Sequence, residues 1–306
     1  MSRVSFEELL EAGSHFGHLT SKWNPAMAPY IFKEMNGIHV IDLHKTSAKI
    51  DEAAEALKKL AQQGKTILYV GTKRQAQEPV ATHAEDAGMP YVTERWPGGM
   101  LTNFPTIRKT VAKMENLDRM MSDEQTYGNL SKREQLQLRR QREKLEKNFG
   151  SIREMKSLPS ALLVVDVMSE HIAVHEARIL GIPIFAMVDT NSDPNTIDYA
   201  IPANDDATKS VDLILGALTE AIKEGKMARQ IEGADNGDDE TATDGAPKRR
   251  ERRFQGVRKA RNNRGESNKD LNARIAGKFV SEEDDDDDET ELDEQPTEMQ
   301  DETHEE

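Results

Sequence analysis

The sequence predicts an α/β fold of the doubly wound, Rossmann- or flavodoxin-like type, with a mostly parallel sheet. Apolar runs at 66–71, 161–167 and 182–190 are rich in β-branched residues and do not alternate with polar ones. This pattern is typical of strands that are covered on both faces. Amphipathic segments of helical length separate the runs. Strands that alternate with such helices form βαβ units with right-handed crossovers, which favours a parallel sheet.

Weaker signals complete the predicted α/β domain. Additional short strands are expected at 37–43, 89–94 and 199–204. Helices are expected at 45–64, 73–88, 170–181 and 205–226. The first three of these helices end at a glycine, which is a common residue just beyond a helix C-terminus.

Residues 106–158 interrupt the alternation, because they contain no strand pattern. Apolar residues recur every three or four positions on either side of a turn at 127–129, which predicts an inserted antiparallel coiled-coil hairpin. Residues 101–150 contain 11 Lys and Arg against 7 Asp and Glu, a net charge of +4. Two interpretations fit this charge: a solvated coiled coil, or an arm that lies on a polyanion.

The charge of the chain is concentrated in a tail, 231–306. The net charge of the whole chain is −15. Residues 1–230 contain 29 basic and 31 acidic residues, whereas the tail contains 12 and 25. A basic block at 248–278 precedes an acidic end at 281–306. Because this segment is so polar, it cannot bury enough apolar surface to fold. We therefore expect the tail to be disordered. The α/β domain then comprises 1–105 and 159–230.

Composition excludes several classes of protein. The chain has no Cys, which excludes disulfides, thiolate metal sites and Cys nucleophiles and suits a reducing cytosol. The first residues lack the basic-then-apolar layout of a signal peptide. No stretch reaches the roughly 18 apolar residues that a membrane helix needs. We therefore expect a soluble, cytoplasmic protein.

Nucleotide motifs are incomplete. Gly64–Thr66 resembles the end of a P-loop, but Lys59 stands where that motif needs Gly, and the segment precedes a strand instead of opening a helix. Residues 71–76, GTKRQA, follow a strand and open a helix, but contain one Gly where a dinucleotide fingerprint needs three. Two interpretations of this segment remain: an ordinary turn between strand and helix, or a site where Thr72, Lys73 and Arg74 contact the phosphate of a polymer.

Carboxylates cluster at 188–207, after a predicted strand. Together with an imidazole they could hold a divalent cation, and the candidate ligands are His18, Asp189, Asp205 and Asp206. Asp also caps helices and shapes turns, which is the structural alternative. His171 and His175 lie one helical turn apart but lack the Glu base of a zinc protease helix. No GxSxG elbow or acid–base carboxylate pair is present, so the sequence predicts no enzyme and no required cofactor.

Three further stretches combine flat or basic side chains with glycine. In GSHFGHLTSKWNP, Phe16 and Trp23 could stack on a base or pack on the domain, and basic or imidazole groups flank them. In RWPGGMLTNF, glycines allow close approach to a polymer backbone. The contact candidates from these stretches and from the hairpin are His15, Phe16, His18, Lys22, Trp23, Arg95, Trp96, Gly98, Gly99, Asn103, Arg108, Arg139, Arg140 and Arg142.

Taken together, the motifs resemble a known family. The chain contains, in this order, GSHFGHLTSKWNPAMAPYIF, NGIHVIDLHKT, YVGTKRQA, ERWPGGMLTNFPTIRK, EHIAVHEA and VDTNSDPNTIDYAIPANDDATKSV. Over residues 4–226 it closely resembles the bacterial small-subunit ribosomal protein S-two family. The resemblance implies a doubly wound domain with a protruding coiled-coil hairpin, placed on the solvent side of the small subunit between head and body.

The resemblance also implies a function. Family members contact small-subunit rRNA and neighbouring small-subunit proteins, and help hold ribosomal protein S-one, which captures messenger RNA. They are structural parts and not enzymes, with no membrane and no small-molecule substrate. The alternative is a free α/β enzyme that binds a nucleotide or a metal. That alternative predicts activity or tight ligand binding in the isolated protein.

Overall fold

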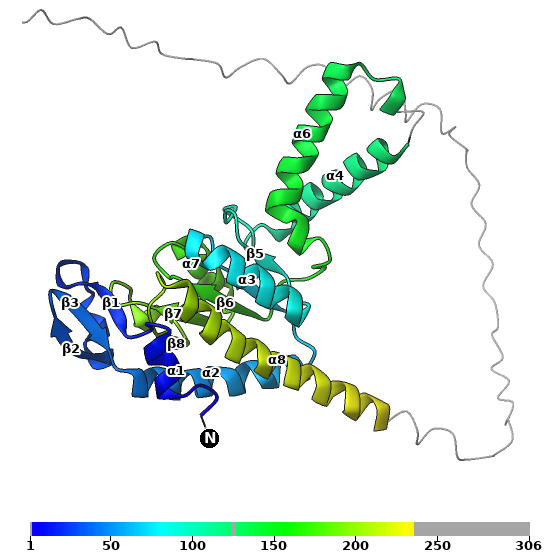
Figure 1. The fold of residues 1–306 in the computed structure, drawn as a ribbon. Coiled ribbons are helices and arrows are strands. Elements are labelled where there is room, and N and C mark those ends of the chain that lie inside the picture. Colours follow the sequence, from blue (N-terminus) through cyan, green and yellow to red (C-terminus); the bar gives the residue numbers. More distant parts are fainter. Residues whose placement is uncertain (1, 124–126, 236–306) are drawn as a thin grey trace, which may run out of the picture. The chain divides into compact units, whose positions relative to one another are not determined.

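A five-stranded, all-parallel sheet forms the centre of the α/β domain (Figure 1). The computed structural model describes residues 2–123 and 127–235. Most of the predicted tail, with its basic block and acidic end, therefore lies outside the described residues. The strands, in the spatial order β5-β4-β6-β7-β8, are β5 (Tyr91–Val92), β4 (Ile67–Val70), β6 (Ala161–Val165), β7 (Ile184–Val188) and β8 (Tyr199–Pro202). The predicted α/β fold is confirmed.

Helices cover both faces of this sheet. The helices that pack on the sheet are α2 (Leu43–Gln62), α3 (Arg74–Ala87), α7 (His171–Leu180) and α8 (Thr208–Asp235). Alternate residues of β6 point to opposite faces: Leu163 joins the core under α2, α3 and α8, while Leu162 and Val164 join the core under α7. Because both faces are buried, the central strands need apolar residues at every position, which explains their uninterrupted apolar runs.

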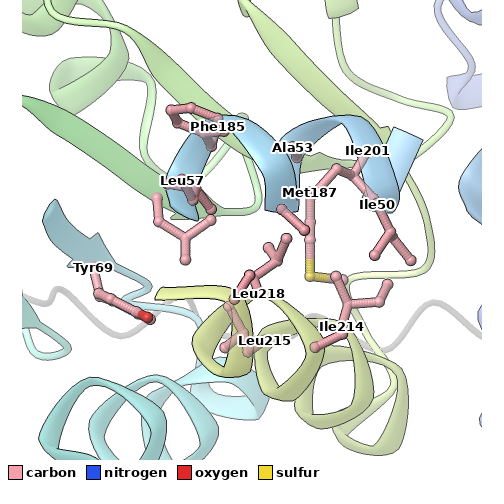
Figure 2. Close-up of a cluster of buried hydrophobic side chains, with 14 of the residues drawn as sticks. Ile50, Ala53, Leu57, Tyr69, Phe185, Met187, Ile201, Ile214, Leu215 and Leu218 are labelled. Atoms are coloured by element: carbon pink, nitrogen blue, oxygen red, sulfur yellow. The ribbon is translucent and has the colours of Figure 1, made fainter. Parts of the chain in front are cut away.

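The most extensive helix contact among the described residues lies between α2 and α8, which pack over one face of the sheet (Figure 2). Gly225 of α8 makes this approach possible. A Cβ at that position would overlap the carbonyl oxygen of Lys58 and would lie 2.9 Å from the Cβ of Ala61. In the same core the hydroxyl of Tyr69 lies 3.0 Å from Oγ1 of Thr219, and burial raises the pKa of Tyr69 to about 12.

A second, antiparallel sheet precedes the α/β domain. It has the order β1-β3-β2, with β1 (Phe16–Leu19), β2 (Ile31–Met35) and β3 (Ile38–Ile41). Asn36 and Gly37 join β2 to β3 with φ angles of 54° and 75°, as a two-residue hairpin turn requires. The strand expected at 37–43 is thus present as β3, and it belongs to this small sheet because the turn pairs it with its neighbour in sequence. Helix α1 (Phe6–Glu11) precedes β1.

The inserted segment forms the two expected helices, α4 (Phe104–Ser122) and α6 (Lys132–Phe149), which extend away from the main sheet in Figure 1. Val111 and Met114 of α4 are fully buried. Asp118 of α4 accepts hydrogen bonds from Arg142 of α6 and from Arg153, which follows α6, so one carboxylate links the two helices. Within the described residues, no helix is both long enough and apolar enough to cross a membrane.

The close approach at Gly225 gives the first prediction. Gly225→Ala should lower the free energy of unfolding by about 1–3 kcal/mol, because the added methyl group overpacks the α2–α8 contact. Gly216→Ala on the same helix is the control, since its Cβ would lie 3.4 Å from the His83 ring and should gain roughly 0.5–1 kcal/mol of helix propensity. Urea unfolding measures both changes. Equal effects at the two positions would contradict the packing argument.

Candidate functional site

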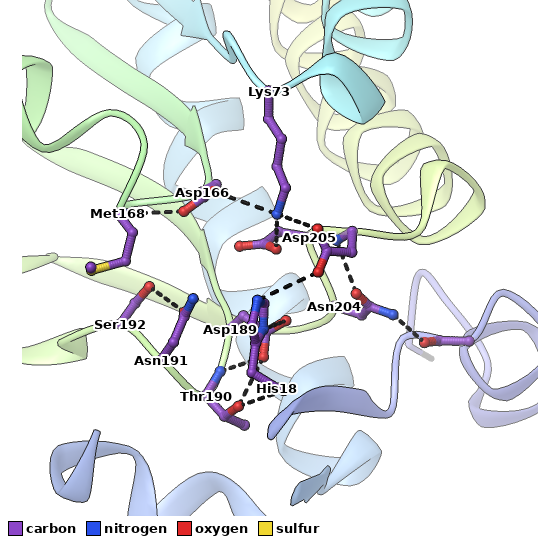
Figure 3. A network of polar contacts seen from close by, with 12 residues as sticks. His18, Lys73, Asp166, Met168, Asp189, Thr190, Asn191, Ser192, Asn204 and Asp205 are labelled. Atoms are coloured by element: carbon purple, nitrogen blue, oxygen red, sulfur yellow. Dashed lines mark hydrogen bonds and ion pairs between the residues drawn. The ribbon is translucent and has the colours of Figure 1, made fainter. Parts of the chain in front are cut away.

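Polar side chains meet at the carboxyl ends of four neighbouring strands (Figure 3). Lys73 follows β4, Asp166 follows β6, Asp189 follows β7 and Asp205 follows β8. Asp166 adopts a φ of 67°, and its carboxylate accepts hydrogen bonds from the backbone of Met168 and from the side chain and backbone of Ser169. This edge of a parallel sheet is where α/β folds gather ligand-binding groups.

Lys73 is the central cation of this network. Its Nζ lies 2.6 Å from Oδ1 of Asp205, 2.6 Å from Oδ1 of Asp206 and 3.5 Å from Oδ2 of Asp166. Burial opposes its charge, but hydrogen bonds to Asp205 and Asp206 outweigh burial and raise the pKa of Lys73. The sequence suggested that Lys73 meets a polymer phosphate. The structure instead pairs its charge with carboxylates of the protein.

His18 connects the small sheet to the same network. Its Nδ1 lies 3.0 Å from Oδ2 of Asp189, and its Nε2 lies 3.4 Å from Oδ2 of Asp206. The backbone N–H of His18 donates to Oγ1 of Thr190 at 2.8 Å. The preceding Gly17 permits this contact, since a Cβ there would lie 2.6 Å from a methyl carbon of Thr190. The hydrogen bond to Asp189 raises the pKa of His18.

Asp205 is fully buried, and its Oδ2 has no hydrogen-bond partner among the described residues. Burial, followed by the negative charges of Asp166 and Asp189, raises the pKa of Asp205 to about 7. His18, Asp189 and Asp205 offer ligand atoms that all lie within 4.8 Å of one another. One imidazole and two carboxylates in such proximity could hold a divalent cation.

The other Asp residues of this stretch have local roles. Asp193 caps a short 3-10 helix, Pro194–Thr196, by accepting a hydrogen bond from Asn195. Asp198 accepts the backbone N–H of Ile184, the first residue of β7, at 2.9 Å. The sequence could not separate these Asp residues from the clustered ones. It also missed Asp166, whose only signal is its position directly after a buried strand.

The balance of charge in this network gives a pH-dependent prediction. Lys73→Met should lower the free energy of unfolding by about 3–5 kcal/mol at pH 8, because it leaves buried carboxylates without their cation. The change should raise the pKa of Asp205 in the folded protein further above its value in the unfolded chain. Protonation of Asp205 then relieves its repulsion with Asp166 and Asp189. The loss in the free energy of unfolding should therefore shrink as pH falls through the folded-state pKa of Asp205 toward pH 5.

Urea unfolding at both pH values measures this effect. Lys49→Met is the matched control, because Lys49 pairs with Glu52 on the surface of α2. An exposed pair of this kind contributes about 0–1 kcal/mol, with little change between pH 5 and pH 8. A loss for Lys73→Met that is the same at both pH values would show that the carboxylates do not respond to this cation.

A buried carboxylate organises the loop of the RWPGGMLTN segment. Glu176 of α7 accepts hydrogen bonds from the indole of Trp96, from the backbone of Gly99 and Leu101, and from the backbone and hydroxyl of Thr102. Burial alone would raise the pKa of Glu176, but these donors lower it below the ordinary value. Trp96 is itself buried, so it holds the loop in place and offers no face for stacking.

The remaining candidates differ in how free their charges are. Among the described residues, Arg139 and Arg140 are exposed on α6 and have no ion pair, whereas Arg142 pairs with Asp118 and Glu146. Arg108 donates to the backbone carbonyl of Arg153. The other candidates fall into two groups. One group is exposed, on loops or at the start of α3: Lys22, Arg74, Arg95, Gly98 and Asn103. The other group, Thr72 and Gly99, is partly buried, and the backbone N–H of Thr72 donates to Glu170.

The opening stretch carries an apolar surface on the small sheet. Phe16, Leu19 and Met35 are each about half exposed, at 48%, 52% and 48%. Register places them on one face, because Phe16 pairs with Val40 and both Leu19 and Met35 pair with Ile38. The ring of His15 lies 3.9 Å from that of Phe16. Trp23 is 37% exposed, and its ring lies 5.0 Å from that of His39.

Comparison with known proteins decides the family. Residues 9–225 match the family described as Ribosomal protein S2. The chain belongs to the ribosomal protein S2 family. It is 62% identical over 283 residues to the Small ribosomal subunit protein uS2 of Parabacteroides distasonis, which covers 92% of this chain and 100% of the relative.

Other relatives agree. The protein of the same name from Porphyromonas gingivalis is 67% identical over 232 residues, 76% of this chain and 82% of the relative. The one from Phocaeicola vulgatus is 58% identical over 287 residues, 92% of this chain and 99% of the relative. The family resemblance inferred from the motifs is thus confirmed. Ribosomal protein S2 is a structural protein, so the chain is not an enzyme.

Proposed function

We propose that this protein is a structural component of the small ribosomal subunit, that it binds small-subunit rRNA, and that it helps to dock ribosomal protein S-one in the cytoplasm. The observation that carries the proposal is the family match over residues 9–225. Relatives that align along their full length are named as small-subunit proteins. We propose in addition that residues 106–158 act as a coiled-coil arm.

Exposed cations on the hairpin support RNA binding. Arg139 and Arg140 lie exposed on α6 without an ion pair in the described part of the chain, and Lys144 follows one turn later, also exposed. Unpaired Arg and Lys side chains on a helix surface suit the phosphates of a polynucleotide, and each phosphate contact releases counterions. Phosphate contacts of this kind fix the position of a protein on RNA without reading its sequence.

Salt dependence tests the role of the hairpin. Arg139→Gln with Arg140→Gln should reduce the slope of log K against log salt by about 1.4 to 1.8 for binding to a transcript of small-subunit rRNA. Arg142→Gln is the matched control, because its guanidinium already pairs with Asp118. We expect the slope to stay unchanged for that control. If the double variant also keeps its slope, the hairpin is not an RNA contact.

Sedimentation tests the proposed place of the protein in the cell. A lysate resolved on a sucrose gradient should show the chain comigrating with small subunits and whole ribosomes, and this comigration should survive moderate salt. A peak at the position of free protein would overturn the structural role.

The apolar face of the small sheet supports docking of a protein. Contiguous exposed apolar side chains commonly mark interaction sites, and Phe16, Leu19 and Met35 form such a face. Small subunits that carry Leu19→Asp with Met35→Asp should keep the chain but lose S-one on the gradient. Retention of S-one at the wild-type level would exclude this face as its docking site.

We also propose that His18, Asp189 and Asp205 hold a divalent cation. The unpartnered Oδ2 of Asp205 supports this, since a cation would complete its interactions. An imidazole ligand favours a transition metal such as Zn²⁺ over Mg²⁺. Zn²⁺ at about 100 times its Kd should stabilise the fold by about 2.7 kcal/mol, measured as a rise in Tm, and Asp189→Asn should abolish the rise. Elemental analysis of purified protein that finds no metal would exclude the site.

A further inference from the structure

A cleft lies at the opposite edge of the main sheet from the carboxylate network. It has a volume of about 870 Å³. Its walls come from four places: the turn after α2, the segment from the end of α3 to the start of β5, the segment from the end of α6 to residue 157, and the end of α8. These four segments are far apart in the sequence. Of this lining, the sequence drew attention only to Gly64–Thr66, and there as an incomplete P-loop.

Cations without internal partners line this cleft. Lys65, Lys156 and Arg229 are all exposed, and none forms an ion pair within the part of the chain that the structure describes. Of the three carboxylates in the lining, only Glu146 has a cationic partner within the described residues, so Glu85 and Glu154 offset part of this positive charge. Glu85 accepts a hydrogen bond from the hydroxyl of Tyr91, and Glu146 pairs with Arg142. The cleft therefore presents an excess of unpaired positive charge.

Two deeper groups extend this pattern. Nε of Arg153 is buried and has no hydrogen-bond partner among the described residues, although the same guanidinium binds Asp118 through Nη2. Within the described residues, the ammonium of Lys226 donates to the backbone carbonyls of Ala87 and Gly88 and to no carboxylate, and burial lowers its pKa. Both side chains are cationic and lie at the wall of the cleft. Arg153 has an unused N–H donor, and the charge of Lys226 has no carboxylate partner in the cleft.

The side chain of Arg229 packs against backbone at one wall of the cleft. Its guanidinium lies against Gly64, where a Cβ would overlap it. Gly64 has a φ of 72°, a conformation that favours glycine. Gly64 follows the end of α2 and Arg229 belongs to α8, so the α2–α8 packing brings this guanidinium beside the turn that lines the cleft.

We propose that this cleft binds the backbone phosphates of rRNA through Lys65, Lys156 and Arg229. The inference rests on the proposed RNA-binding function and adds to it a site separate from the exposed face of α6. Arg and Lys suit phosphate oxygens, Arg as a planar donor fork and Lys as a compact point charge. Three cations on separate segments would contact the RNA backbone at the base of the hairpin and so fix the orientation of the arm.

The test compares two triple variants of the full-length chain. Lys65→Gln, Lys156→Gln and Arg229→Gln together should reduce the slope of log K against log salt by about 2 to 3 for a small-subunit rRNA transcript. The control removes the same charge elsewhere, by Lys59→Gln, Arg178→Gln and Lys209→Gln, which are exposed positions outside the cleft. The control should keep the wild-type slope. Circular dichroism and Tm confirm that both variants are folded.

Two outcomes would overturn the proposal. One is a cleft variant whose salt slope equals that of the control, even though the chain comigrates with small subunits; the protein would then be ribosomal without using this cleft. The other concerns the acidic end at 281–306. If carbodiimide joins Lys65 or Lys156 to that segment in the free protein, and added rRNA transcript does not reduce the crosslink, the ligand of the cleft is the chain's own acidic end.

Discussion

The neutralisation of carboxylates at the carboxyl edge of the sheet is the constraint on which the arrangement of the domain depends. Asp166, Asp189 and Asp205 are buried where β6, β7 and β8 end. Lys73 supplies a cation from the end of β4, and His18 supplies an imidazole from the small sheet. The same interactions that offset the burial of these charges therefore join the two sheets.

This network also bears on how a protein that is near neutral over 1–230 could bind RNA as proposed. At the carboxyl edge, Lys73 and His18 pair with the protein's own carboxylates. The hydrogen bond to Asp189 raises the pKa of His18, and hydrogen bonds to Asp205 and Asp206 raise the pKa of Lys73 against the effect of burial. Arg139, Arg140 and Lys144 of α6 have no such partners in the described part of the chain, and neither do the exposed cations of the cleft. Net charge is therefore a poor guide to function here, and the distribution of charge decides it.

Much of the fold could be predicted from the sequence because local rules agree. Uninterrupted apolar runs identify β4, β6 and β7, and glycines mark the ends of α3 and α7. The pattern of β3 alone did not predict the separate sheet, since a strand of four residues does not reveal its partner. The signal that could have revealed it is the Asn36–Gly37 turn, which is typical of a hairpin. At the site, Asp189 and Asp205 were predicted together with His18. Asp166 and Glu176 were missed because their roles depend on tertiary contacts.

The most direct test of the whole account is a high-resolution cryo-electron microscopy reconstruction of small subunits purified from the source cells. The account predicts that the chain is present, that rRNA phosphates lie within hydrogen-bond distance of Arg139 or Arg140, and that RNA backbone also occupies the cleft of Lys65, Lys156 and Arg229. A reconstruction in which the chain is bound but both surfaces face solvent or protein would contradict the assignment of RNA to these cations.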